Sequence, residues 1–215
     1  MLNERGFVMK ELSGIEIYEN LKEIIDPRHS CLVIWDVQNG LVSRIFNKTE
    51  FISGLKSLVN ILRGKMPIAY TLITPPEKEF RSSWSYFAMM RRFGVDEPSK
   101  LPEFMAKDSN DRNILQDITP QTGDILLEKP TASIFIGTYF EQMMKNRNIK
   151  TLIFTGIATE IGIESSARDA AKRGFYPVIA TDCVSSMDKE AHNRSLENMQ
   201  KMFICESSQT IVKNV

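Results

Sequence analysis

Two charged residues follow apolar runs of the chain. Asp36 directly follows the run Cys31–Trp35, and Lys129 comes shortly after the run Asp124–Leu127. An unpaired carboxylate at the end of a buried segment is costly, and a lysine partner would hold it charged or tune its proton affinity. Asp36 and Lys129 are therefore candidate catalytic residues. Two ordinary interpretations stay open, in which Asp36 caps the next turn and Lys129 is a solvated loop lysine.

Other polar residues also follow apolar runs. Ligands of open α/β sheets bind beyond the carboxyl ends of the strands, so Gln38, Thr159 and Glu160 are candidate substrate contacts. Residues 156–162 (GIATEIG) turn from a strand into a helix, whose free backbone N–H groups suit an anion or a developing oxyanion. Every such turn offers these groups, so an ordinary turn remains an alternative. Gly162 costs a helix about 1 kcal/mol relative to Ala, and it is expected to leave space for a ligand.

A long proline-rich segment, about residues 74–123, separates the second and third apolar runs. Loops of this length are usually functional or carry short elements of their own, and Trp84–Arg92 is a candidate helix. Arg81 is expected to grip a substrate carboxylate, and Trp84 to cover an apolar part of the substrate. The whole segment is equally an active-site lid or a surface excursion that packs a subunit interface, and plain surface packing of Arg81 and Trp84 stays open as well.

Strands and helices must position these residues. Continuous apolar runs are typical of parallel strands that are buried on both faces, and strand–helix alternation favours a doubly wound α/β sheet. A further helix is predicted over about residues 12–25, and the whole chain, 1–215, is expected to be one domain. The predicted strands are Cys31–Trp35, Ile68–Ile73, Asp124–Leu127, Thr151–Thr155, Pro177–Thr181 and a weaker Met202–Cys205; the predicted helices are Phe51–Arg63, Thr138–Lys145, Ile161–Lys172 and Asp188–Lys201.

Composition narrows the function further. The 27 basic and 27 acidic residues balance, which gives no global attraction to nucleic acid or to a membrane surface. The 3 cysteines and 2 histidines have no metal-ligand spacing, so we expect no metal and no cofactor. Unpaired cysteines, with no signal peptide and no apolar span, favour a cytoplasmic protein.

Three sequence blocks resemble the isochorismatase-like (cysteine hydrolase) superfamily, over about residues 30–205. The blocks are residues 32–39 (LVIWDVQN), 128–138 (EKPTASIFIGT) and 155–170 (TGIATEIGIESSARDA). The resemblance implies a three-layer α/β/α Rossmann-like fold with a six-stranded parallel sheet. It also implies a small-molecule substrate and a homo-oligomer, dimer or tetramer, in which Arg81 and Trp84 serve their own or a neighbouring subunit's site.

The resemblance assigns site residues and shows one departure. Asp36 and Lys129 match the family's acid and lysine, and a non-proline cis peptide bond is implied between Ile157 and Ala158, with backbone N–H groups turned toward an oxyanion. Where most members carry the nucleophilic cysteine, this chain has Gly162. Isochorismatases of the family also carry Gly there and hydrolyse a vinyl ether, which needs a proton donor and water but no thiol.

Three functional interpretations follow. The first is a thiol-independent hydrolase of a carboxylate-bearing molecule, with Asp36 as general acid beside Lys129. The second is an amide or carbamoyl hydrolase that uses Asp36 with a directly activated water or with Thr159. The third is a catalytically silent homologue that binds a small ligand or serves assembly. The acid–lysine pair argues against the third, since a buried pair without a function is replaceable by apolar residues.

Overall fold

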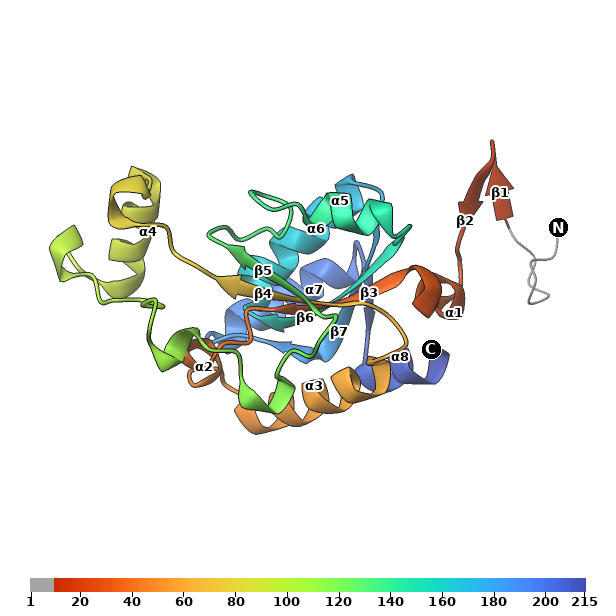
Figure 1. Ribbon diagram of the computed structural model, residues 1–215, viewed down its shortest axis with the longest axis horizontal. Coiled ribbons are helices and arrows are strands. Elements are labelled where there is room, and N and C mark those ends of the chain that lie inside the picture. The colour runs from red at the N-terminus through yellow and green to blue at the C-terminus, as the bar shows by residue number, and fades with distance from the viewer. Residues whose placement is uncertain (1–9) are drawn as a thin grey trace.

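A computed structural model describes residues 10–215 of the chain. Its centre is a parallel sheet of six strands in the order β5-β4-β3-β6-β7-β8, which confirms the predicted fold class (Figure 1). The chain runs outward from β3 in one direction and from β6 in the other, so the strand order reverses between these two neighbours. Such a reversal is where open α/β sheets bind ligands. The strands are β3 (Ser30–Trp35), β4 (Ile68–Ile73), β5 (Ile125–Lys129), β6 (Thr151–Ile157), β7 (Tyr176–Ser185) and β8 (Ile204–Glu206).

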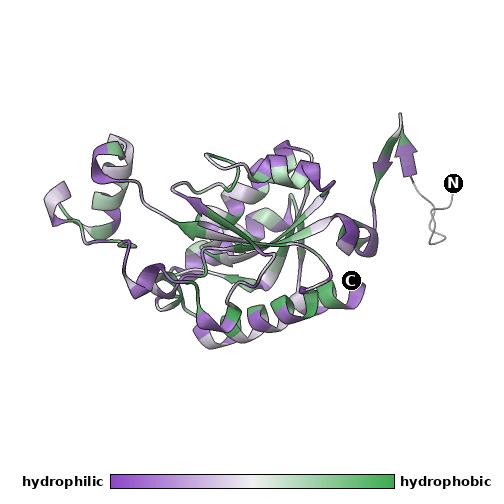
Figure 2. Ribbon diagram, viewed as in Figure 1, coloured by the Kyte–Doolittle hydropathy of each residue, from purple (hydrophilic) through white to green (hydrophobic). Residues whose placement is uncertain are grey.

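Helices cover both faces of the sheet (Figure 1). One face is covered by α3 and α8, and the other by α5, α6 and α7, as the two separate apolar clusters also show. Hydrophobic residues are concentrated in the strands between these layers (Figure 2). The helices are α1 (Leu21–Ile24), α2 (Asn39–Val42), α3 (Lys48–Leu62), α4 (Ser83–Phe93), α5 (Phe140–Asn146), α6 (Glu164–Lys172), α7 (Lys189–Gln200) and α8 (Ser208–Asn214).

Strand β3 divides its side chains between the two layers. Every residue of β3 is buried, because β4 and β6 flank it and helices cover both faces. Leu32 and Ile34 belong to the cluster under α3, whereas Val33 and Trp35 belong to the cluster under α6. This period of two is the ordinary alternation of a strand. It directs Trp35 toward α6 at the point where β3 ends.

The predicted helix over residues 12–25 is wrong. Residues 10–17 form a hairpin, β1 (Lys10–Leu12) and β2 (Ile15–Ile17), and only Leu21–Ile24 is helical (Figure 1). The two residues between the strands, Ser13 and Gly14, both have positive φ, 54° and 79°. That is the geometry of a two-residue hairpin turn, and it interrupts a helix.

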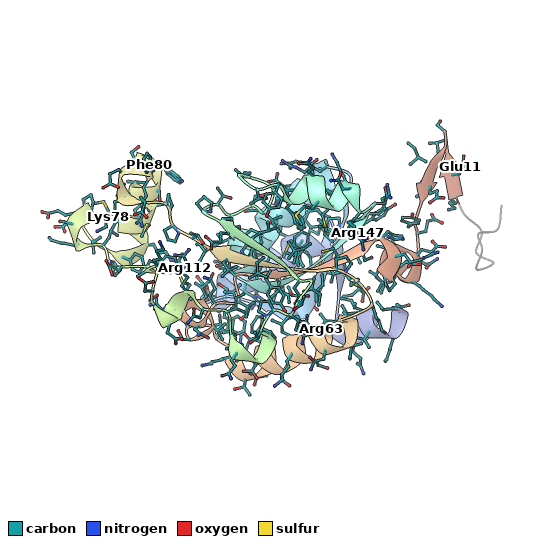
Figure 3. All side chains as sticks on the ribbon, in the orientation of Figure 1. Glu11, Arg63, Lys78, Phe80, Arg112 and Arg147 are labelled. Carbon is teal, nitrogen blue, oxygen red and sulfur yellow. The ribbon has the colours of Figure 1, made fainter. Side chains whose placement is uncertain are left out.

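The long segment after β4 carries the expected short helix. Helix α4 begins after Ser82, whose side chain accepts a hydrogen bond from the Ser85 N–H, and ends at Gly94 in the left-handed conformation. The segment projects from the body as an arm that carries Lys78 and Phe80, and Arg112 lies where the arm returns to the body (Figure 3). Within residues 10–215, no helix is long and apolar enough to cross a membrane.

Candidate active site

Asp36 and Lys129 form a buried ion pair at the carboxyl ends of β3 and β5. The Lys129 Nζ lies 2.8 Å from the Asp36 Oδ2, and both side chains are almost completely buried. Strand β4 lies between β3 and β5 and contributes Thr71, whose hydroxyl donates to the Asp36 Oδ1 at 2.6 Å. The predicted contact between acid and lysine is therefore confirmed. Asp36 itself has a φ of 47°, a conformation uncommon outside glycine, as the chain turns off the sheet.

Burial governs the protonation of this pair. Desolvation raises the pKa of Asp36 above its ordinary value, although the nearby Lys129 ammonium and the Thr71 hydroxyl oppose that shift. Desolvation likewise lowers the pKa of Lys129, against the attraction of Asp36. A raised pKa makes Asp36 a better proton carrier near neutral pH than an ordinary carboxyl group.

Trp35 is the second partner of Lys129. The ammonium lies 3.8 Å from the centroid of the Trp35 ring, within the range of a cation–π interaction. Lys129 therefore touches a carboxylate with one side of its ammonium and an aromatic face with another. These two contacts offset part of the cost of burying its charge.

The same indole ring lies against Gly162. A Cβ built on Gly162 would lie only 1.9 Å from the Trp35 Nε1 and 2.2 Å from its Cε2. Gly156, which has a φ of 113°, is pressed as closely on the Trp35 backbone, where a Cβ would lie 2.1 Å from the carbonyl oxygen. Gly156, near the end of β6, and Gly162, in the turn after it, are thus both required by Trp35. The indole fills the space that a side chain at position 162 would need, so Gly162 makes room for Trp35 and not, as predicted, for a ligand.

A cavity of about 230 Å³ opens beside the ion pair. Its charged residues are Asp36, Lys129 and Arg92, and since the first two compensate each other, Arg92 leaves a net positive charge. A cavity of this size and charge suits a small anion. It is lined by Trp35, Asp36, Leu41, Ile73, Arg92, Phe104, Lys129, Pro130, Thr131, Ala132, Ile157, Ala158, Ile161, Gly162 and Met187.

No thiol belongs to this cavity. The three cysteines of the chain all lie within the described residues, and none of them lines it. Burial raises the pKa of the Cys31 and Cys183 thiols to about 12 and that of Cys205 to about 11. Thiols with such pKa values are poor nucleophiles at neutral pH. Among residues 10–215, no group of three or more His, Cys, Asp or Glu side chains is placed to hold a metal ion.

The backbone residues of the predicted site lie at the cavity, but the Gly162 N–H is paired within its own turn and is not free for an oxyanion. Ile157, Ala158 and Gly162 all line the cavity, and the peptide bond between Ile157 and Ala158 is cis. Residues 159–163 form a π-helical turn that runs into α6, and in it the Gly162 N–H donates to the Ala158 carbonyl at 3.0 Å. Turns of this kind are frequent at functional sites.

Gln38, a predicted substrate contact, holds the strand ends together instead. It is fully buried and does not line the cavity. Its amide donates to the Arg112 carbonyl at 2.8 Å and accepts from the Ile73 N–H at 2.9 Å. Gln38 thus joins the end of β4 to the returning arm.

Thr159 and Glu160 are also turned away from the cavity. The Thr159 hydroxyl donates to the Ser185 carbonyl at 3.1 Å and lies 2.8 Å from the His192 Nδ1. Glu160 accepts a hydrogen bond from the Ser186 hydroxyl at 2.8 Å. Neither residue lines the cavity, so the Glu160 charge is kept out of it.

The arm brings a different arginine to the cavity from the one predicted. The Arg81 Nε donates to the Pro76 carbonyl at 3.0 Å, and Trp84 is 71% exposed; neither lines the cavity of its own chain. Arg92, at the other end of α4, does line it, and its guanidinium lies 3.9 Å from the Met187 sulfur. Neither Arg92 nor Trp35 was predicted from the sequence as a site residue, although both line the cavity. For Trp35, a bulky aromatic before Asp36 combined with glycine at position 162 was the available signal.

Comparison with known proteins agrees with this architecture. The isochorismatase domain family matches residues 30–209. The chain is 33% identical over 107 residues to the ureidoacrylate amidohydrolase RutB of Methylobacterium radiotolerans, covering 49% of the chain but only 42% of that protein. It is 26% identical over 199 residues to RutB of Enterobacter sp. strain 638, covering 82% of the chain and 84% of that protein. A cysteine hydrolase from Pseudomonas syringae pv. phaseolicola 1448A has the same fold, with a TM-score of 0.75 and 16% identity over 89% of this chain and 94% of that one.

Proposed function

The chain belongs to the isochorismatase family, and we propose that it is a hydrolase of a small carboxylate-bearing molecule that works without a cysteine nucleophile. In this proposal Asp36 is the general acid, Lys129 holds and tunes it, and Gly162 replaces the family's cysteine. The observation that carries the proposal is the contact between Trp35 and Gly162. A nucleophile at position 162 has no room, and no other thiol reaches the cavity.

Asp36 suits a reaction that begins with proton transfer. In the hydrolysis of a vinyl ether, Asp36 donates its proton to the terminal vinyl carbon, and the positive charge is shared by the other vinyl carbon and the ether oxygen. Water adds to that carbon and returns a proton to Asp36, and the hemiketal then separates into a carbonyl compound and an alcohol. Lys129, 2.8 Å away, stabilises the carboxylate while the proton is on the substrate.

Charge in the cavity favours an anionic substrate. Arg92 lines the cavity and the Asp36–Lys129 pair is neutral as a whole, whereas Glu160 is held by Ser186 outside it. A guanidinium binds a carboxylate through charge-assisted hydrogen bonds. These positions support a substrate with one carboxylate, and in this proposal Arg92 takes the binding role that the sequence suggested for Arg81.

A second candidate is the hydrolysis of an amide or urea bond by activated water. The observation that favours it is the 26% identity to a ureidoacrylate amidohydrolase over 82% of the chain. Thr159 does not serve as its nucleophile, because the hydroxyl is fully buried and donates to the Ser185 carbonyl. In this reaction Asp36 would take a proton from water, so its carboxylate form would be the active one.

A homo-oligomer is the remaining part of the proposal. The arm exposes Phe80 by 82%, Trp84 by 71% and Phe87 by 50%. Exposed aromatic clusters of this kind mark interaction surfaces, and a second copy of the chain would cover them and bring Arg81 to a neighbouring site. Light scattering after size exclusion tests this part: a dimer or tetramer supports it, and a monomer contradicts it.

Initial rates on a small panel test the main proposal. The panel pairs carboxylate-bearing vinyl ethers with amides and ureas of matched size, and each rate is measured before and after treatment with iodoacetamide, with Asp36→Asn as the blank. We expect turnover of a vinyl ether that the alkylating agent leaves unchanged and Asp36→Asn abolishes. Loss of activity in step with alkylation would contradict the thiol-independent mechanism, and an active Asp36→Asn variant would remove Asp36 from catalysis.

A further inference from the structure

The indole N–H of Trp35, a residue that lines the cavity, is an unpaired hydrogen-bond donor. Trp35 lines the cavity, and its Nε1 has no hydrogen-bond partner among residues 10–215. Buried tryptophans usually pair this group, so an N–H left free beside a cavity is a group that a ligand can satisfy.

The indole N–H of Trp35 lies where a side chain at position 162 would begin. The Nε1 lies 1.9 Å from where the Cβ of a residue at position 162 would be. A side chain at position 162 would begin at this point, and this chain has the Trp35 donor there instead. A nucleophile attacks a carbon, whereas a donor binds an electron-rich oxygen.

Lys129 strengthens the donor. Its ammonium lies 3.8 Å from the centroid of the Trp35 ring. A cation on the face of the ring draws electron density from the indole and polarises its N–H, as neighbouring polar groups do in a hydrogen-bonded chain. The remaining free charge of the cavity, on Arg92, is also positive.

We infer that the Trp35 indole N–H is a substrate-binding donor that seats one carboxylate oxygen of an anionic substrate beside Gly162. The inference rests on the proposed function only in taking this cavity as the substrate site. In this inference the substrate is held near position 162 by a hydrogen bond and not by a covalent bond to a side chain there. It also explains why a tryptophan, rather than a smaller apolar residue, ends β3.

Indole NMR tests the inference without turnover. In the Trp84→Phe background, Trp35 is the one tryptophan left of the chain's 2, so its ¹⁵N-labelled indole gives a single N–H signal. Pyruvate and benzoate are titrated in, with benzamide as the neutral counterpart. We expect the indole proton to shift downfield and saturate with the carboxylates, and benzamide to bind more weakly. An indole signal that does not move at saturating carboxylate, or failure of both carboxylates to bind, overturns the inference.

A variant gives an independent measurement. Trp35→Phe keeps an aromatic face for Lys129 and removes the N–H. We expect it to weaken carboxylate affinity about 10- to 100-fold, which is the range for a hydrogen bond to a charged group. Unchanged affinity in a folded Trp35→Phe protein overturns the inference. If Trp35→Phe does not fold, the NMR titration of the natural Trp35 indole still tests the inference. An indole shift without hydrolysis of any substrate would contradict the proposed function and leave the donor role intact.

Discussion

The indole of Trp35 lies against the Cα of Gly162, with its Nε1 1.9 Å from the position that a Cβ at residue 162 would occupy. One residue ends β3 and the other lies in the turn before α6, at opposite sides of the strand-order reversal. The contact ties the shape of the cavity to its chemistry, because it excludes a side chain at the head of the helix and leaves a donor in its place.

Enlarging Gly162 should destabilise the protein. We expect Gly162→Ala to lower the free energy of unfolding by about 1–3 kcal/mol, the usual range for overpacking a core, and Gly162→Cys to do at least as much without gaining a reactive thiol. Urea unfolding measures the first effect and the rate of alkylation the second. Wild-type stability of Gly162→Ala would show that the indole does not fill this space.

Two further variants serve as controls for that result. Gly54, in the middle of α3, has ordinary space for a Cβ, whose nearest atoms would lie 3.6 Å away, so Gly54→Ala should be neutral or stabilising by up to about 1 kcal/mol. Trp35→Val should make room for a side chain at position 162, and Gly162→Cys should then cost less in that background. Additive effects of the two changes would contradict a direct contact.

The Asp36–Lys129 pair should be retained for function rather than stability. Replacing Lys129 alone by Met leaves a buried carboxylate unpaired, which should lower the free energy of unfolding by about 3–5 kcal/mol, whereas Asp36→Leu combined with Lys129→Met should be close to wild type or more stable. The double variant should have no activity. Chemical denaturation and the substrate panel check both statements; a double variant less stable than either single one would mean that the pair stabilises the fold.

The pH dependence follows from the raised pKa of Asp36. An acid catalyst is active when protonated, so kcat/KM should be highest at low pH and fall as the pH rises through the Asp36 pKa, which burial places above its ordinary 3.8. Folding has the same sign: the folded protein binds the proton more tightly, so this group's contribution to stability falls as the pH rises between the two pKa values. A rate that instead increases with pH would identify the carboxylate as the active form and favour amide or urea hydrolysis.

Arg92 should bind the substrate from its own chain. We expect Arg92→Met to raise KM or the Kd of a carboxylate about tenfold, a typical value for a charge-assisted hydrogen bond. Arg81→Met is the matched comparison, since Arg81 lies on the same arm outside the cavity. An effect at Arg81 but not at Arg92, measured by calorimetry with the same carboxylate, would place the arm over the site of a neighbouring subunit.

The sequence was informative where local patterns determine position. Apolar runs identified the strands of the sheet, and because parallel strands end at one edge, they also brought Asp36 and Lys129 together. The hairpin at Ser13–Gly14 was missed, because a two-residue turn with positive φ is hard to distinguish from a helical pattern in so short a stretch. The sequence also does not predict which way a side chain points within a turn: Thr159 and Glu160 follow β6 as expected but point away from the cavity.

Long-range packing decided what the sequence could not. Arg81 comes two residues before one short helix and Arg92 lies in its last turn, and only the path of the arm determines which reaches the cavity. Trp35 appears in the sequence as the last apolar residue of a strand. Its role emerges only when β3 and β6 are paired, with Trp35 opposite Gly156, and the turn after β6 brings Gly162 onto its ring.

Hydrolysis in D₂O tests the central claim most directly. If Asp36 protonates a vinyl carbon, the product of a carboxylate-bearing vinyl ether must contain one deuterium on the carbon that was the terminal vinyl position. Mass spectrometry of the promptly quenched product measures this deuterium, with Asp36→Asn as the comparison. We predict one deuterium per turnover from the natural protein and no enzymatic product from Asp36→Asn. Turnover without deuterium on that carbon, or equal turnover by Asp36→Asn, would contradict acid catalysis by Asp36.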